Sequence, residues 1–138
     1  MTRVFVDTSA LVALLDRADP RHAEVGETFR GFVDAELVSH GYVVAETLAV
    51  TRRRLGVEAT VALIDDLLPA IEVLHVAPTE HATALARYRA SLPSAVSFVD
   101  LVSFGVIERE GIGTAFVLDA DFVATGVDMH PAVKVARG

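Results

Sequence analysis

The sequence predicts an α/β fold in which strands and helices alternate and the strands form a parallel sheet. Residues 4–6, Val-Phe-Val, form a short apolar run typical of a strand buried on both faces. Residues 10–15 are apolar on nearly all sides, which indicates a helix deep in the protein. Further short apolar runs follow, separated by stretches of helical periodicity, and this alternation implies a parallel sheet.

The composition is that of a folded domain. The chain has 138 residues, of which 52% are hydrophobic, and its mean hydropathy is +0.46, so we expect one domain over 1–138. The absence of cysteine excludes disulfides and thiolate zinc sites. The longest uncharged stretch, 90–99, is too short to cross a bilayer. Because the N-terminus runs directly into a strand, we expect no signal peptide, no membrane partner and a cytoplasmic location.

The first half of the chain continues with two helices around a strand. Residues 21–33 follow Pro20, which suits the first turn of a helix, and they carry an apolar stripe. Residues 36–39 predict the second strand. Residues 41–55 predict a helix that ends in three arginines, which favour the negative end of the helix dipole.

The second half begins with a helix over 57–68, closed by Pro69. The β-branched residues within 71–77 predict the third strand. A helix over 79–92 follows, and Thr79 is its expected N-cap.

The last part holds the most apolar of the later helices, at 97–111, which is therefore expected to be central. Residues 115–118 predict the fourth strand and 132–135 a short last strand. Five strands are thus expected in all.

Asp7 stands where the first strand ends and the first helix begins. In open α/β sheets, ligands and chemistry gather at the carboxyl ends of the strands, so Asp7 is a candidate site residue. Aspartate is also a preferred helix N-cap, and this residue alone does not distinguish the two roles.

Glu46 is a second carboxylate in apolar surroundings. On the helix over 41–55 its neighbours at helical spacing are apolar, among them Tyr42 and Val50. A lone carboxylate on such a face is costly to bury, so Glu46 either lies at the rim of the face or meets a cation.

Two further acids lie at element ends. Asp100 is in the first turn of the helix that begins at Ser97, where Ser-x-x-Asp is also a capping box. Asp119 follows the fourth strand, and Asp121 is a further candidate two residues later.

Because the carboxyl ends of parallel strands share one edge, Asp7, Asp100 and Asp119 are expected to meet there. Carboxylates packed together raise one another's pKa, so such a cluster holds either protons or cations. Oxygen ligands without Cys or His favour Mg²⁺ or Mn²⁺ over zinc. Four carboxylates with two divalent ions would be close to neutral and could accept a phosphodiester.

The net charge of −7 argues against a nucleic-acid partner. The objection is met if metal ions offset the acids locally and arginines line the approach. The candidate substrate-binding residues are Arg52, Arg53, Arg54, Arg87 and Arg89. For the first three, a solvated helix end is the alternative.

At this point the sequence resembles the PIN-domain proteins, and in particular the toxins of VapBC-type bacterial toxin–antitoxin pairs. The resemblance rests on the order of four pieces over essentially the whole chain: Val-Asp-Thr-Ser-Ala-Leu from 6, Ala-Glu from 45, Ser-Phe-Val-Asp from 97 and Leu-Asp-Ala-Asp-Phe from 118. The family implies a three-layer α/β/α fold with a central parallel five-stranded sheet. It also implies a metal-dependent ribonuclease site at the carboxyl end of the strands.

Carried onto this chain, the resemblance makes four residues both catalytic and metal-binding: Asp7, Glu46, Asp100 and Asp119. Asp121 is a possible further ligand, and Thr8, Ser9 and Ser97 would support the carboxylates. The implied chemistry is hydrolysis of an RNA phosphodiester by water activated on one or two Mg²⁺ or Mn²⁺ ions. The implied partners are RNA, a cognate VapB-type antitoxin that blocks the site, and a second copy in a homodimer.

Other readings of the first strand end fail on single residues. A haloacid-type phosphatase needs an Asp where Ser9 stands, and a dinucleotide enzyme needs a glycine-rich loop after the first strand. The alternative that stays open is a catalytically silent PIN-type module that binds RNA or protein.

Overall fold

The structure, a computed structural model, describes residues 1–132 and contains a five-stranded, all-parallel sheet. The strands are β1 (Arg3–Val6), β2 (Glu36–His40), β3 (Ile71–Leu74), β4 (Thr114–Phe116) and β5 (Asp128–His130). Their order across the sheet is β3-β2-β1-β4-β5. The predicted fold class, an α/β fold with a central parallel sheet, is confirmed.

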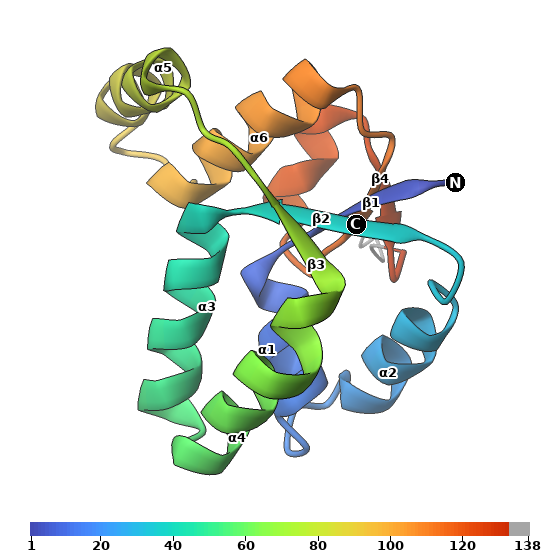
Figure 1. Cartoon of the computed structure of the whole chain (residues 1–138). Coiled ribbons are helices and arrows are strands. Elements are labelled where there is room, and N and C mark those ends of the chain that lie inside the picture. The colour runs from blue at the N-terminus through green and yellow to red at the C-terminus, as the bar shows by residue number, and fades with distance from the viewer. Residues whose placement is uncertain (133–138) are drawn as a thin grey trace, which may run out of the picture.

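Helices cover both faces of the sheet (Figure 1). They are α1 (Thr8–Leu15), α2 (His22–Arg30), α3 (Gly41–Arg54), α4 (Val57–Ala62), α5 (Pro78–Ala90) and α6 (Phe98–Glu110), with short turns η1 (Leu63–Leu67), η2 (Leu68–Ala70) and η3 (Ala120–Thr125). In Figure 1, α5 and α6 lie above the sheet, and α1, α2 and α4 lie below it. Within the described residues, no helix is both long enough and apolar enough to span a bilayer.

The two layers of helices bury two separate apolar cores, and the alternation of side chains along β1 decides which residue enters which. Phe5 points into the core beneath α5 and α6, whereas Val4 and Val6 point into the core with α1 and α2. All three side chains are at most 1% exposed. Burial on both faces explains why this strand is a continuous apolar run.

The order of the strands reverses between β1 and β4. From β1 the chain moves outward through β2 to β3, and it then returns to place β4 on the other side of β1. The backbone N–H of Asp7 donates to the carbonyl of Phe116 at 3.1 Å, so the ends of these two strands are tied together. Such a reversal leaves a crevice at the carboxyl ends of the strands, where α/β proteins bind ligands.

Two strand predictions differ from the structure. The third strand ends at Leu74 and not at residue 77, because β2 gives way to a helix after His40, the partner of Leu74. The fifth strand is Asp128–His130, which pairs with β4; the predicted strand over 132–135 lies outside the described residues except for Ala132.

Two helix predictions also need correction. The helix expected over 57–68 is regular only to Ala62; it continues as the wider turn η1 and then as the tighter turn η2, which contains Pro69 and ends at Ala70. Thr79 is not the N-cap of α5: the helix begins at Pro78, and the side chain of Glu80 accepts the backbone N–H of Ala77 at 3.0 Å.

Candidate active site

The four predicted acids lie around one cavity at the carboxyl edge of the sheet. The cavity has a volume of about 430 Å³. It is lined by Asp7, Glu46, Asp100 and Asp119, together with Thr8, Ser9, Ser97 and seven further residues that include Asp19 and Arg54. Side chains from widely separated parts of the sequence thus meet as the parallel topology predicts.

Asp7 is a helix cap and a cavity residue at once. Its Oδ2 accepts both the backbone N–H of Ser9 at 3.0 Å and the hydroxyl of Ser9 at 2.6 Å, so it caps α1. Its Oδ1 is buried and has no hydrogen-bond partner. An unpartnered carboxylate oxygen in a buried position is costly. Capping therefore explains the position of Oδ2 but not that of Oδ1.

Ser9 joins the end of β1 to the segment after β4. Its hydroxyl donates to Asp7 and accepts the backbone N–H of Leu118 at 2.9 Å. Leu118 directly precedes Asp119, so one serine fixes the approach of two acids to each other.

Thr8, the first residue of α1, joins this helix to α3. Its hydroxyl lies 2.9 Å from that of Thr47, which donates to the carbonyl of Val43 at 2.7 Å. Thr47 directly follows Glu46 in the sequence. Glu46 itself is half-buried at the cavity wall, at the rim position that the sequence allowed.

Asp100 is buried in the first turn of α6, where Ser97 accepts its backbone N–H at 3.0 Å. Oxygens of Asp100, Asp119 and Asp121 lie within 4.8 Å of one another. Asp121 does not line the cavity, and its backbone N–H donates to Asp119 Oδ1 at 2.9 Å. It therefore lies beside the acid cluster and behind Asp119.

The environment favours protons on these acids. Burial raises the pKa of Asp7 to about 6, although the hydrogen bonds from Ser9 act against the shift and the charges of Asp119 and Glu46 add to it. Burial also raises the pKa of Asp100 to about 8, with a hydrogen bond to Asp119 and the surrounding negative charges as further causes. For Asp121, partial burial and Asp119 raise the pKa.

No salt bridge within residues 1–132 joins a basic side chain to Asp7, Glu46, Asp100 or Asp119. Crowded carboxylates without a resident cation hold either protons or metal ions at neutral pH. The donor set fits a hard divalent cation, since it offers carboxylate oxygens alone and one of them, Asp7 Oδ1, has no other partner.

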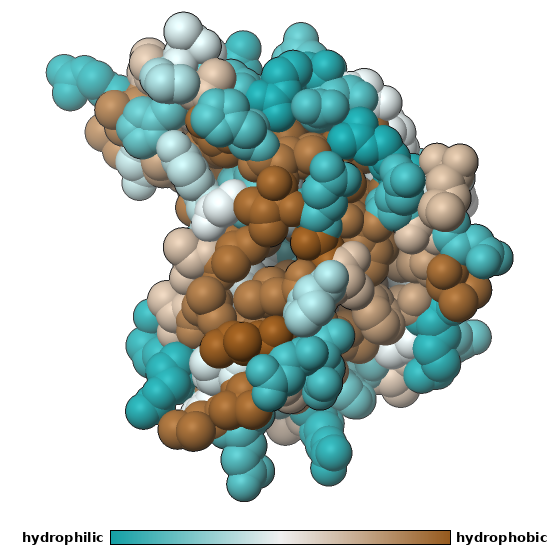
Figure 2. All heavy atoms as spheres, in the orientation of Figure 1, coloured by the Kyte–Doolittle hydropathy of each residue, from teal (hydrophilic) through white to brown (hydrophobic). Residues whose placement is uncertain are grey.

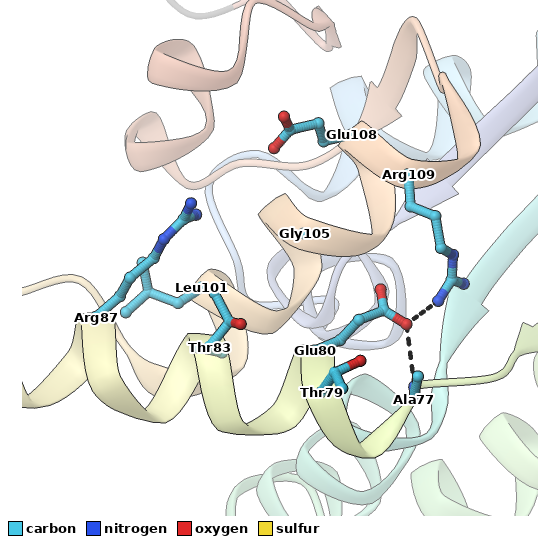
Figure 3. A pocket seen from close by; sticks show the side chains of 10 residues that line it. Ala77, Thr79, Glu80, Thr83, Arg87, Leu101, Gly105, Glu108 and Arg109 are labelled. Carbon is cyan, nitrogen blue, oxygen red and sulfur yellow. Dashed lines mark hydrogen bonds and ion pairs between the residues drawn. The ribbon is translucent and has the colours of Figure 1, made fainter.

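The structure separates the five candidate arginines. Arg54 lines the acid cavity, on the same helix stripe as Glu46 and Val50. Arg52 and Arg53 are exposed and do not line it. Arg87 lines a different cleft, of about 480 Å³ between α5 and α6, which shares no lining residue with the acid cavity (Figure 3). Arg89 is exposed on α5.

Sequence reasoning missed His40, a fully buried histidine at the end of β2. It is the N-cap of α3, and its Nε2 lies 2.8 Å from the hydroxyl of Ser103 on α6. Burial lowers the pKa of His40 to about 4, and the negative charge of Glu80 opposes the shift. The signal was present: a polar residue between a buried strand and a helix is the same pattern that singled out Asp7.

Comparison with known proteins places this geometry among nucleases. The family model described as PIN domain matches residues 4–127. The chain is 33% identical to the 23S rRNA-specific endonuclease VapC20 of Mycobacterium tuberculosis, over 93% of this chain and 98% of that protein. A second relative from the same organism, ribonuclease VapC26, is 44% identical over 46% of this chain and 47% of its own length.

Solved structures give the same result. The crystal structure of M. tuberculosis VapC20, described as a toxin that cleaves the sarcin–ricin loop, superposes with a TM-score of 0.78 at 31% identity, over 91% of this chain and 96% of that one. VapBC2 from Rickettsia felis, bound to a DNA fragment of its promoter, superposes with a TM-score of 0.68 over 94% and 98%. At 12% identity this second match concerns the fold alone.

Proposed function

The chain belongs to the PIN-domain family, and on that premise we propose that it is a metal-dependent endoribonuclease and the toxin of a type II toxin–antitoxin pair. The nuclease part follows from the PIN-domain match, from a relative named 23S rRNA-specific endonuclease VapC20 that covers 93% of the chain, and from the ribonuclease VapC26, which matches 46% of it. We further propose which metal the protein uses, which residues bind it and which partners the protein has. We also propose that one domain extends over all 138 residues.

The observation that carries the proposal is the buried, unpartnered Oδ1 of Asp7 inside a cavity that Glu46, Asp100 and Asp119 also line. A fold gains nothing from such a group unless a ligand completes it. We assign the metal to Asp7, Glu46, Asp100 and Asp119, with Asp121 as an outer ligand or as a group that orients Asp119.

The ion is Mg²⁺ or Mn²⁺, as one or two ions. A bound divalent ion supplies a water of lowered pKa and stabilises charge on a phosphodiester oxygen. The residues of the chain provide the geometry: Ser9 holds Asp7 against the segment that carries Asp119, and Thr8 with Thr47 holds α1 against α3. Ser97 orients the turn that carries Asp100.

Arg54 is the residue of this chain best placed to bind the RNA backbone. It lies two helical turns after Glu46 on the same stripe of α3, which corresponds to about 12 Å along the helix axis. That spacing suits a phosphate beyond the scissile one. Arg52, Arg53, Arg87 and Arg89 would contribute only to the general field around the molecule.

The remaining partners are a VapB-type antitoxin that closes the cavity and a second copy of the chain, in the cytoplasm. A homodimer is supported by exposed apolar side chains on neighbouring elements: Val57 and Val61 of α4, Ile64 of η1 and Val73 of the edge strand β3. Figure 2 shows this apolar surface as a continuous brown band between α5 and α4. Substituting Val61→Glu should shift the protein from dimer to monomer in light scattering, and an unchanged mass would contradict this surface.

The second candidate function is a PIN-type module that binds RNA or protein without cutting. It would be favoured if one acid were missing from the cavity, and all four are there.

The test is cleavage of total RNA by the purified protein with Mg²⁺, with Mn²⁺ and with EDTA, beside an identically prepared Asp7→Asn variant. Metal-dependent cleavage by the wild type alone supports the nuclease. Equal cleavage by both proteins identifies a contaminating enzyme. If neither protein cuts RNA and Mn²⁺ leaves the melting temperature of the wild type unchanged, the binding module becomes the better account.

A further inference from the structure

His40 is a buried side chain that contacts elements leading to two of the cavity acids. Its ring centroid lies 5.9 Å from that of Phe5, in the strand that ends at Asp7. Its Nε2 lies 2.8 Å from the hydroxyl of Ser103, on the helix that begins with Asp100. It is also the N-cap of α3, the helix that carries the glutamate of the cavity.

The hydrogen bonds around His40 assign its proton. The backbone N–H of Tyr42 donates to Nδ1 at 3.2 Å, so Nδ1 is the acceptor and Nε2 carries the hydrogen. Nε2–H then donates to Ser103, whose hydroxyl donates to the carbonyl of Val99 at 3.0 Å. One arrangement of protons satisfies the whole series, and both His40 and Ser103 are 0% exposed.

Capping alone does not explain this arrangement. A cap needs a single acceptor, which Asn would supply at this position. Ser103 needs no partner on α3, because its hydroxyl already bonds to its own helix. The hydrogen bond between the two side chains therefore has a further effect. It links the start of α3 to α6 and so fixes how each helix is rotated about its own axis, which apolar contacts alone do not specify.

We propose that His40 is a positioning residue whose bond to Ser103 fixes the distance between Glu46 and Asp100 across the cavity. Ser103 lies about one helical turn after Asp100 on α6. His40 is the N-cap of α3, the helix that carries Glu46. A rotation of α6 would therefore carry the carboxylate of Asp100 with it. Carboxylates that share an ion tolerate little displacement, since ligand geometry decides affinity. This inference rests on the proposed function, because it takes the acids to be metal ligands.

Two substitutions of His40 separate the cap from the link. His40→Asn keeps an acceptor where Nδ1 lies, so it retains the cap but does not reach Ser103. His40→Gln carries an amide N–H where Nε2 lies, so it retains the link and loses the cap. Ser103→Ala removes the link from the other side and leaves the cap intact.

The first readout is Mn²⁺ affinity by calorimetry without RNA; the second is kcat and KM for RNA cleavage, all measured well below each melting temperature. His40→Asn and Ser103→Ala should each weaken Mn²⁺ binding and lower kcat by about tenfold, with KM changed less than about twofold. His40→Gln should stay within about threefold of the wild type in both readouts. Because they remove the same bond, the double variant His40→Asn/Ser103→Ala should be no worse than either single one.

Tyr42→Phe is the matched control. It removes the bond between Tyr42 and His81, 2.7 Å long, which joins α3 to α5, a helix without a cavity acid. It should leave Mn²⁺ affinity and kcat unchanged. A His40→Gln variant that binds Mn²⁺ as weakly as His40→Asn, or an unimpaired Ser103→Ala, would overturn the proposal. If the wild type binds Mn²⁺ but cuts no RNA, the nuclease function fails while the affinities still decide the role of His40; a wild type that binds no Mn²⁺ contradicts both.

Discussion

Two groups of carboxylates in this protein have opposite surroundings. Those of the cavity, Asp7 and Asp100, are buried beside other acids. Those at the junction of α5 and α6, Glu80 and Glu110, are both paired with Arg109. Figure 3 shows the contact of Arg109 with Glu80. Arg109 also donates to the carbonyl of His75 at 2.9 Å.

The pKa values of the two groups move in opposite directions, and the causes differ. Burial raises the pKa of Asp7 and Asp100, whereas hydrogen bonds from Arg3 and Arg109 lower the pKa of Glu110. The fold thus pairs Glu80 and Glu110 with an arginine, whereas no salt bridge within residues 1–132 reaches the four cavity acids, although Arg54 lines the same cavity. This difference supports the proposal that a metal ion from solution binds among the cavity acids.

The largest expected effect is on activity. Asp100→Asn should lower kcat for RNA cleavage by about a thousandfold, because it removes a charged ligand from the centre of the cavity. Glu110→Gln, a matched change on the same helix, should leave cleavage unchanged in the same assay. Similar losses in the two variants would break the distinction between the two groups of acids.

A second expected effect is on the pH dependence of stability without metal. Asp7 and Asp100 bind their protons more tightly in the folded state than in the unfolded state, so their contribution to the free energy of unfolding is full below pH 3.8 and is lost as the pH rises through about 6 and about 8. Urea unfolding in EDTA should therefore give a free energy lower by about 5 kcal/mol at pH 9 than at pH 5.

Saturating Mn²⁺ should remove most of that fall, because the ion replaces the protons. Stability that rises between these pH values in EDTA would contradict the account of the cavity.

A third, smaller effect is expected at the paired acids. Arg109→Ala leaves Glu80 half-buried without its cation and should lower the free energy of unfolding by about 1 to 2 kcal/mol, a modest value because the pair is partly exposed. Cleavage measured below the melting temperature should not change. A loss of cleavage without a loss of stability would show that this junction takes part in the site.

The smallest expected effect concerns Arg54. Arg54→Ala should lower kcat/KM by about tenfold and reduce the salt dependence of RNA binding by about one ion. Arg89→Ala, which changes an exposed arginine on α5, is the control and should leave both quantities within about twofold. Equal effects of the two substitutions would show that the arginines act on RNA only through their long-range positive charge, and that Arg54 makes no specific phosphate contact.

The sequence was sufficient for the features that local chemistry determines. The run before Asp7 had to be a buried strand, and parallel topology then brought Asp7, Asp100 and Asp119 to one edge. The strand at Asp128–His130 was not predictable in the same way. Asp, Met and His have little preference for strands, and pairing with β4 imposes the conformation.

Other features depend on tertiary contacts that the sequence does not display. The sequence offered five arginines as equal candidates for substrate binding, and only the packing of α3 beside the cavity distinguishes Arg54 from Arg52 and Arg53. The link from His40 to Ser103 joins residues 63 positions apart, which no local pattern indicates. The same holds for the contact of Ser9 with Leu118.

The most direct test of the central claim, that the cavity carboxylates repel one another until a divalent ion binds, compares melting temperatures of the wild type and Asp7→Asn at about pH 8, first in EDTA and then in Mn²⁺. The account predicts that Asp7→Asn melts higher in EDTA, because a buried charge is gone, and that Mn²⁺ reverses the order by stabilising the wild type alone. If the wild type is the more stable protein in EDTA and Mn²⁺ raises both melting temperatures equally, Asp7 is only a helix cap and the claim is wrong.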